Sequence, residues 1–106
     1  MLVSPQIGVF TFGSEPVNAG DIVSVLCTVT KGDFPLEIQW MFQNQPLSEK
    51  NRDVVVIDSG KRGKQLTIET VRAENAGEYT CIASNIAGST SRSVILDVNG
   101  ILSHTG

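Results

Sequence analysis

Two cysteines, one tryptophan and one tyrosine constrain the fold of this chain more than any other feature. Trp40 lies 13 residues after Cys27, and Cys81 lies 54 residues after Cys27. Tyr79 precedes the second cysteine by two residues. This spacing is typical of a sandwich of two β-sheets, in which the indole packs against paired cysteines and the tyrosine hydroxyl binds backbone at a corner. We therefore expect Trp40, Tyr79 and Leu66 to mark the core.

Short runs of alternating apolar and polar residues recur along the chain, with turn residues between them. In residues 22–30, every second residue from Val23 to Val29 is apolar or cysteine, which predicts a strand with one buried face. Leu26 falls on the opposite, outward face. Similar runs predict further strands at 5–12, 37–42, 65–69, 78–83 and 94–98, and no segment longer than a turn is expected to be helical. The sequence therefore predicts an all-β domain.

One predicted strand has an ambiguous orientation. Residues 54–57 are four consecutive β-branched side chains, so no alternation shows which of them face the core. Either Val54 and Val56 or Val55 and Ile57 must point outward. We take Val54 and Val56 as the outward pair.

The length of 106 residues fits a single domain. We expect this domain to span residues 1–99 and residues 100–106 to form a C-terminal linker or tail. No apolar stretch approaches the roughly 20 residues of a membrane span, and the first residues do not form a signal peptide. Direct membrane contact is therefore not expected.

Charge and side-chain chemistry exclude several classes of function. A net charge of −3 provides no clustered basic surface for nucleic acid. The single histidine, His104, lies in the expected tail, and the two cysteines are expected to bind each other. We therefore expect no catalytic residues, no metal site and no cofactor. The basic turn at 61–64 is interpreted as solvated surface, with an acidic glycan or partner as the alternative.

The chain resembles the I-set immunoglobulin domains of cell-adhesion molecules across nearly its whole length. The resemblance rests on Cys27, Trp40, Leu66-x-Ile68 and Gly77-x-Tyr79-x-Cys81-x-Ala83-x-Asn85-x-x-Gly88. Residues 5–18 and 23–38 are similar to the arthropod Dscam family, most of all to its variable seventh immunoglobulin domain or the first domain of the shortened Dscams of chelicerates. One departure is Asn75, where the family commonly has an aspartate that pairs with a basic residue. Asparagine cannot form that ion pair.

The resemblance implies a sandwich with ABED and A′GFC sheets, inside a longer extracellular receptor with neighbouring immunoglobulin domains. Cysteines on opposite sheets of such a sandwich predict one buried disulfide, which requires an oxidising compartment. The alternative is an intracellular structural domain of muscle, in which the same two cysteines stay reduced. A third possibility is a heterophilic ligand- or matrix-binding domain of a surface receptor.

The residues alone favour neither outer face as a binding surface. Leu26 points outward on the ABED side, whereas Met41, Ile82 and Ile95 point outward on the GFC side. The Dscam resemblance implies isoform-specific, weak self-association of two antiparallel copies through their ABED faces. On that basis, the expected homophilic interface contains Ser24, Leu26, Thr28, Val54, Val56, Thr67 and Glu69.

Overall fold

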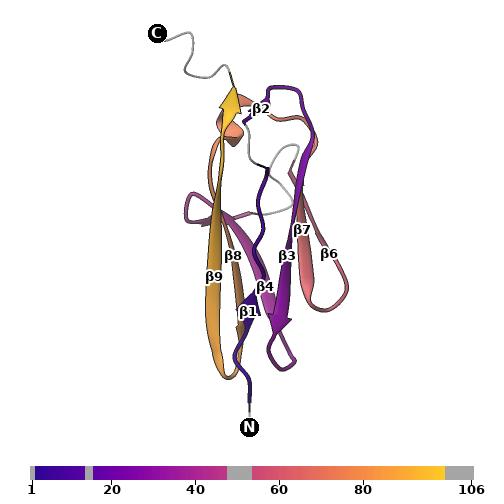
Figure 1. Cartoon of the computed structure of the whole chain (residues 1–106), viewed down its shortest axis with the longest axis vertical. Coiled ribbons are helices and arrows are strands. Elements are labelled where there is room, and N and C mark those ends of the chain that lie inside the picture. The colour runs from indigo at the N-terminus through magenta and orange to yellow at the C-terminus, as the bar shows by residue number, and fades with distance from the viewer. Residues whose placement is uncertain (1, 14–15, 48–53, 100–106) are drawn as a thin grey trace.

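The computed structural model describes residues 2–13, 16–47 and 54–99, which form two facing β-sheets (Figure 1). The first sheet contains, in spatial order, β1 (Gln6–Ile7), β3 (Val23–Lys31), β7 (Gly63–Ile68) and β6 (Val54–Asp58). The second contains β5 (Gln45–Pro46), β4 (Glu37–Phe42), β8 (Gly77–Asn85) and β9 (Gly88–Leu96). A parallel pair of β2 (Val17–Asn18) and β10 (Val98–Asn99) extends the edge beyond β9, and a 3-10 turn, η1 (Ala73–Asn75), leads into β8.

This arrangement confirms the predicted all-β sandwich. The order β1-β3-β7-β6 is the ABED sheet, and β4, β8 and β9 are strands C, F and G of the other sheet, with β2 as A′. The short strand β5 adds one edge to the second sheet that the sequence did not predict. The expected tail 100–106, with His104, lies outside the described residues, so the domain boundary stays a prediction.

The core lies between the two sheets and contains the residues that the cysteine spacing predicts. Cys27 of β3 and Cys81 of β8 form a disulfide that joins one sheet to the other. Trp40 is 1% exposed, and its indole Nε1 donates a hydrogen bond to the Lys64 carbonyl at 3.0 Å. Leu66 is fully buried beside them. A buried indole with its N–H satisfied by the facing sheet ties the two layers together.

Tyr79 forms the predicted corner at the end where η1 lies. Its buried hydroxyl donates a hydrogen bond to the Asn75 carbonyl at 2.6 Å, and burial raises the pKa of Tyr79 to about 12. The Asn75 side chain accepts the Arg72 amide at 2.7 Å, so it closes the η1 turn by a hydrogen bond. Gly77 follows with φ +146, where a Cβ would lie 2.9 Å from the Phe42 ring. Only glycine fits this approach to the corner.

The first predicted strand is much shorter than residues 5–12. Only Gln6 and Ile7 pair with β3, and the register shifts between them. The Gly8 amide still donates to the Thr28 carbonyl at 3.0 Å, and beyond it Val9 is 83% exposed. The ring of Phe10 packs edge-on against Trp40, and the ring of Phe12 packs edge-on against Tyr79. Aromatic packing, not strand pairing, therefore positions this segment.

Candidate interaction surfaces

The outer side of the first sheet presents residues from three strands in aligned rows. Leu26 of β3 lies opposite Gln65 of β7, and Gln65 lies opposite Ile57 of β6. In the adjacent row, Ser24, Thr67 and Val55 follow one another in the same way. We call this surface the ABED face, made of Ser24, Leu26, Thr28, Val55, Ile57, Gln65 and Thr67.

The choice of Val54 and Val56 as outward residues was wrong. Val54 lies opposite the buried Ile68 and is itself 7% exposed, and Val56 packs against the core. Because directly opposed residues of an antiparallel pair point to the same side of the sheet, β7 fixes the orientation of β6. Val55 and Ile57 therefore point outward, with exposed fractions of 39% and 52%.

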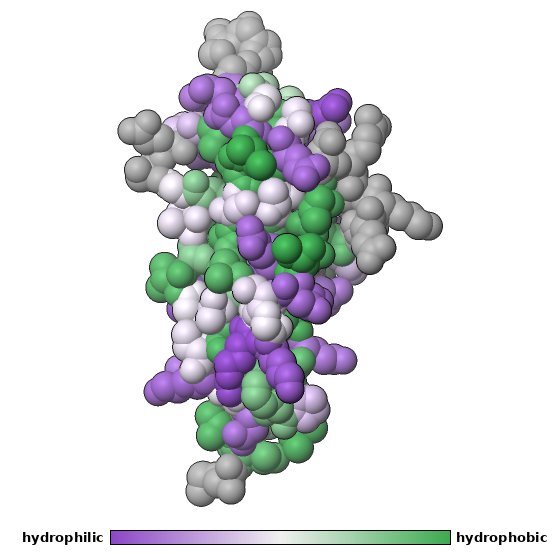
Figure 2. All heavy atoms as spheres, turned by 90° about the vertical axis from the view of Figure 1, so that its right-hand side faces the viewer, coloured by the Kyte–Doolittle hydropathy of each residue, from purple (hydrophilic) through white to green (hydrophobic). Residues whose placement is uncertain are grey.

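The middle of the ABED face is polar, and its edges are apolar. The hydroxyls of Ser24 and Thr67 lie 2.9 Å apart, and the Gln65 amide donates to the Thr67 hydroxyl at 3.4 Å. Leu26 on one flank is 44% exposed, comparable with the residues of β6 on the other flank. Figure 2 views the domain from the side on which β6 and β7 lie in Figure 1, and hydrophobic residues appear there as separate patches between hydrophilic ones.

The remaining predicted interface residues lie at the two ends of this face. Thr28 is exposed, and its partner in the ladder is Gly63, which has no side chain to cover it. Glu69 follows β7 and is exposed. The structure thus brings Ser24, Leu26, Thr28 and Thr67 onto one face, with Glu69 at its end. Sequence reasoning missed Gln65, although its alternation with the buried Leu66 was a usable signal.

The outer side of the second sheet offers a weaker apolar surface. We call it the GFC face, made of Gln39, Met41, Thr80, Ile82, Ser91, Ser93 and Ile95. Met41 and Ile82 are only half-exposed, and Ile95 is the one large apolar residue of this face that is clearly exposed, at 57%. Between them, the hydroxyls of Thr80 and Ser93 lie 2.8 Å apart.

The basic turn between β6 and β7 is not the simple solvated loop that we expected. Arg62 donates a hydrogen bond to the Gly32 carbonyl at 2.9 Å, and its guanidinium lies 4.6 Å from the centre of the Phe34 ring. The Lys64 ammonium donates to the Ile38 carbonyl at 2.9 Å and lies 3.9 Å from the Asp58 carboxylate. These two cations bind the turn to strand β4 and the loop before it. Lys61 is the exposed cation of the turn.

An open groove of about 900 Å³ lies beside this turn, between the loop at 34–36 and the outer edge of β4. Lys61, Lys64 and Glu37 line it together with Phe34 and Ile82. Its charges are of both signs, and Lys64 already binds backbone within it. The groove therefore shows no single ligand chemistry.

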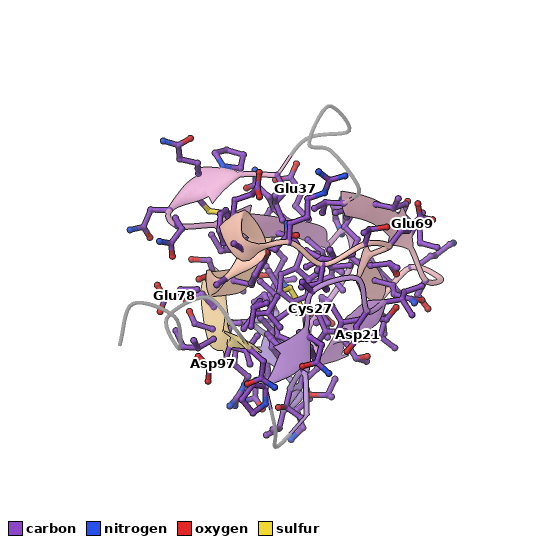
Figure 3. All side chains as sticks on the ribbon, turned by 90° about the horizontal axis from the view of Figure 1, so that it is seen from above. Asp21, Cys27, Glu37, Glu69, Glu78 and Asp97 are labelled. Atoms are coloured by element: carbon purple, nitrogen blue, oxygen red, sulfur yellow. A yellow bond between two sulfur atoms is a disulfide. The ribbon has the colours of Figure 1, made fainter. Side chains whose placement is uncertain are left out.

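The carboxylates of the domain do not converge on one point. In Figure 3, the labelled side chains Asp21, Glu69, Glu78 and Asp97 lie on different sides of the domain around the central disulfide. Across residues 2–13, 16–47 and 54–99, no three side chains of histidine, cysteine, aspartate or glutamate are grouped so as to hold a metal. Within the same ranges, no helix is long and apolar enough to cross a bilayer.

The disulfide, the buried tryptophan and the tyrosine corner together define an immunoglobulin domain. The family described as "Immunoglobulin domain" matches residues 4–85, and the chain belongs to this family. This family is non-enzymatic, and the domain is not an enzyme.

Within that family, the chain is similar to the Dscam adhesion molecules, as predicted. The cell adhesion molecule Dscam1 of Drosophila melanogaster is 37% identical over 99 residues, which are 93% of this chain and 5% of Dscam1. The crystal structure of the Dscam1 Ig7 domain, isoform 5, superposes with a TM-score of 0.88 and 34% identity over 91% of this chain and 97% of that one. The chain therefore spans a small fraction of the curated relative and nearly all of the single Ig7 domain.

Two further matches are to parts of longer structures that contain several domains. The structure of the N-terminal eight Ig domains of DSCAM isoform 1.30.30 has a TM-score of 0.83 and 38% identity, and covers 92% of this chain and 12% of that one. The I-band fragment I67–I69 from titin has a TM-score of 0.79 and 28% identity, and covers 92% of this chain and 33% of that one. Both structures contain several immunoglobulin domains in tandem.

Proposed function

We propose that this domain is an extracellular cell-adhesion module that binds a second copy of itself, isoform-specifically, through antiparallel pairing of ABED faces. The observation that carries the proposal is the aligned row of Leu26, Gln65 and Ile57 across three neighbouring strands. Exposed apolar residues scattered singly on a surface carry no meaning. Two of them in one row on either side of Gln65, with Val55 on the same strand as Ile57, favour an interface.

A two-fold axis through the polar middle of the face makes this surface complementary to itself. In an interface of this symmetry each contact occurs twice, and residues on one flank meet residues of the other copy across the axis. The flanking Leu26 and Ile57 bury apolar area, while the Ser24, Thr67 and Gln65 side chains supply hydrogen-bonding groups between them. A changed side chain is met by an unchanged partner in a mixed pair, so like copies fit and unlike copies clash.

The pairing of single domains is expected to be weak. The face contributes three large exposed apolar side chains from each copy, which is a small apolar core for an interface. Adhesion between cells can use such contacts because many copies on each surface act together, and avidity exceeds the affinity of one pair.

The disulfide supports the extracellular location, because disulfides persist in oxidising compartments and are rare in the cytosol. Thiol titration of the unfolded, unreduced natural protein tests this assignment. We expect no free thiol from Cys27 and Cys81. Two free thiols would instead favour the intracellular structural role suggested by the likeness to titin.

Bead aggregation tests self-recognition directly. Beads coated with the domain should cluster with one another, and beads coated with Leu26→Asp should not, because two unpaired carboxylates would be buried in each interface. The matched control is Ile82→Asp on the GFC face, which should leave clustering intact. Beads that never cluster with each other but capture a different receptor would establish the heterophilic alternative.

A further inference from the structure

The strands of the ABED face restrict where a two-fold axis between two antiparallel copies can lie. Strands β3, β7 and β6 run side by side (Figure 1). In a face-to-face pair with antiparallel strands, the axis runs across these strands, and each strand lies over its own counterpart. Residues of the row that the axis follows face their own copies. Residues at equal distances before and after that row face each other, so the choice of row decides which side chains meet.

We propose that the axis follows the row of Leu26, Gln65 and Ile57, so that Gln65 meets its own counterpart and Glu69 of each copy meets Lys61 of the other. This inference rests on the proposed self-association and adds the register in which the two copies bind. Glu69 directly follows β7, four residues after Gln65, and Lys61 lies in the turn before β7, four residues before Gln65. The axis through Gln65 therefore exchanges the positions of these two charges.

Gln65 has the hydrogen-bonding groups that a position on the axis requires. Its NH₂ group donates to the Thr67 hydroxyl at 3.4 Å, and that hydroxyl lies 2.9 Å from the Ser24 hydroxyl. The side-chain carbonyl of Gln65 has no hydrogen-bond partner among the residues that the structure describes. The NH₂ group has a second hydrogen to donate. Because an amide is both a donor and an acceptor, two facing copies of Gln65 can bond each other reciprocally.

The rows on either side of Gln65 differ in height, and this axis places one against the other. The higher row has a side chain on every strand and consists of Ser24, Thr67 and Val55. The lower row has a glycine on the middle strand and consists of Thr28, Gly63 and Ser59. The axis through Gln65 puts Thr67 of one copy over Gly63 of the other. An axis through Thr67 would instead put the higher row against itself.

The charges at the strand ends favour the same axis. Glu69 and Lys61 are exposed, and neither forms an ion pair with another described residue. On β3, Asp21 and Lys31 lie five residues before and after Leu26, so the axis brings a second pair of opposite charges together. Lysine side chains are long enough to reach a carboxylate across sheets that pack at about 30° to each other. Complementary charges at the rim of an interface fix its register.

Acidic residues also lie at the end of the domain where Lys61 lies. Those in the described part of the chain are Asp33, Glu37 and Asp58. Asp33 accepts a backbone amide of the N-terminal segment at 2.9 Å, and the Asp58 carboxylate lies 3.9 Å from the Lys64 ammonium. Glu37 belongs to β4 and therefore to the second sheet. None of the three is on the ABED face, so they do not take the place of Glu69 from a second copy.

Opposite charges introduced at Gln65 test the position of the axis. Gln65→Glu and Gln65→Lys should each self-associate about tenfold more weakly than the natural domain, because like charges meet on the axis. A mixture of the two variants should regain the lost affinity, because a carboxylate then meets an ammonium. NMR titration of isotope-labelled Gln65→Glu with unlabelled Gln65→Lys measures the mixed pair. The matched control is Gln39 on the GFC face, where the same two substitutions should leave self-association unchanged.

The two end charges provide a second test of the register. Glu69→Lys and Lys61→Glu should each weaken self-association about tenfold, because two attractions become two repulsions. Their mixture should regain it, since every pair is then of opposite sign. Glu78→Lys on the second sheet should have no effect.

The outcomes separate this proposal from the proposed function. If Leu26→Asp abolishes self-association but neither mixture regains it, the ABED face binds in another register and the proposed axis is wrong. Recovery in the Gln65 mixture is the result expected from the axis, and no other row of the face produces it. A natural domain that does not self-associate would refute the proposed function, and the axis with it.

Discussion

The two outer faces of this sandwich are built by the same alternation of inward and outward residues, yet they present different chemistry. On the ABED face, Leu26, Val55 and Ile57 are exposed on strands that flank a polar centre. On the GFC face, Ile95 is strongly exposed, while Met41 and Ile82 are half-buried. The fold therefore provides two candidate surfaces, and the outward residues distinguish them.

The difference shows how strand register, more than composition, creates a surface. The isoleucine and leucine on the ABED face fall in one row because β7 pairs Gln65 with both of their strands. On the GFC face, Ile82 lies between Gln39 and Ser91, so its row has one apolar member. Two apolar residues in one row, on the strands that flank Gln65, are the property that we associate with self-recognition.

Matched isoleucines on the two faces provide the sharpest test of this comparison. Ile57 and Ile95 have exposed fractions of 52% and 57%. Ile57→Ser should weaken the dimer roughly 30-fold, since about 1 kcal/mol of apolar burial is lost from each of two copies. Ile95→Ser should leave the dissociation constant unchanged. Sedimentation velocity of both variants measures the effect, and equal weakening by the two would remove the distinction between the faces.

The register of β6 can be tested by a neighbouring pair of valines. Val54 is buried opposite Ile68, and Val55 is exposed opposite Thr67. Val54→Ala should lower the free energy of unfolding by about 1.5–2 kcal/mol through lost burial and a small cavity. Val55→Ala should change it by less than about 0.5 kcal/mol. Urea denaturation compares the two variants. A larger loss of unfolding free energy in Val55→Ala would mean that Val55, and not Val54, faces the core.

Tyr79 belongs to the scaffold that both faces share, so its change should affect neither surface. Tyr79→Phe should cost about 1 kcal/mol of stability, because the hydrogen bond to the Asn75 carbonyl is lost. The denaturation midpoint should fall, with an unchanged slope and an unchanged dissociation constant. An unaltered midpoint would show that the Tyr79 hydrogen bond does not contribute to stability.

The same tyrosine predicts a pH dependence at the alkaline end. Its pKa of about 12 in the folded domain exceeds the ordinary value of 10.0. Between these values the folded state keeps a proton that the unfolded state loses, so the stabilisation falls as pH rises from about 10 through 12. The stability difference between the natural protein and Tyr79→Phe should shrink over that range and stay constant below it.

Much of the fold follows from the sequence because the spacing of a few residues indicates how distant strands are arranged. The spacing of Cys27, Trp40 and Cys81 predicted the two layers, and the alternation in β3 placed Leu26 outward. The orientation of β6 did not follow, because four β-branched residues carry no period and only pairing with β7 decides it. The extent of β1 depends on how the rings of Phe10 and Phe12 pack, which is a tertiary effect.

The candidate surfaces were predictable only in part, for a related reason. Alternation along one strand identifies outward residues such as Ser24 and Thr28. Which of them lie side by side on a surface depends on the register between strands. The basic turn shows the same limit, since the carbonyls that bind Arg62 and Lys64 come from distant segments. A count of charges could not reveal that these side chains were already bound.

Sedimentation equilibrium over a concentration series, extended to about 1 mM where contacts worth about 4 kcal/mol still show, tests the central claim most directly. The account predicts that the apparent mass of the natural domain rises from one chain toward two. Leu26→Asp should stay monomeric throughout, and Ile82→Asp should associate like the natural protein. A natural domain that remains monomeric at about 1 mM, or association that is lost in Ile82→Asp and kept in Leu26→Asp, would contradict self-recognition through the ABED face.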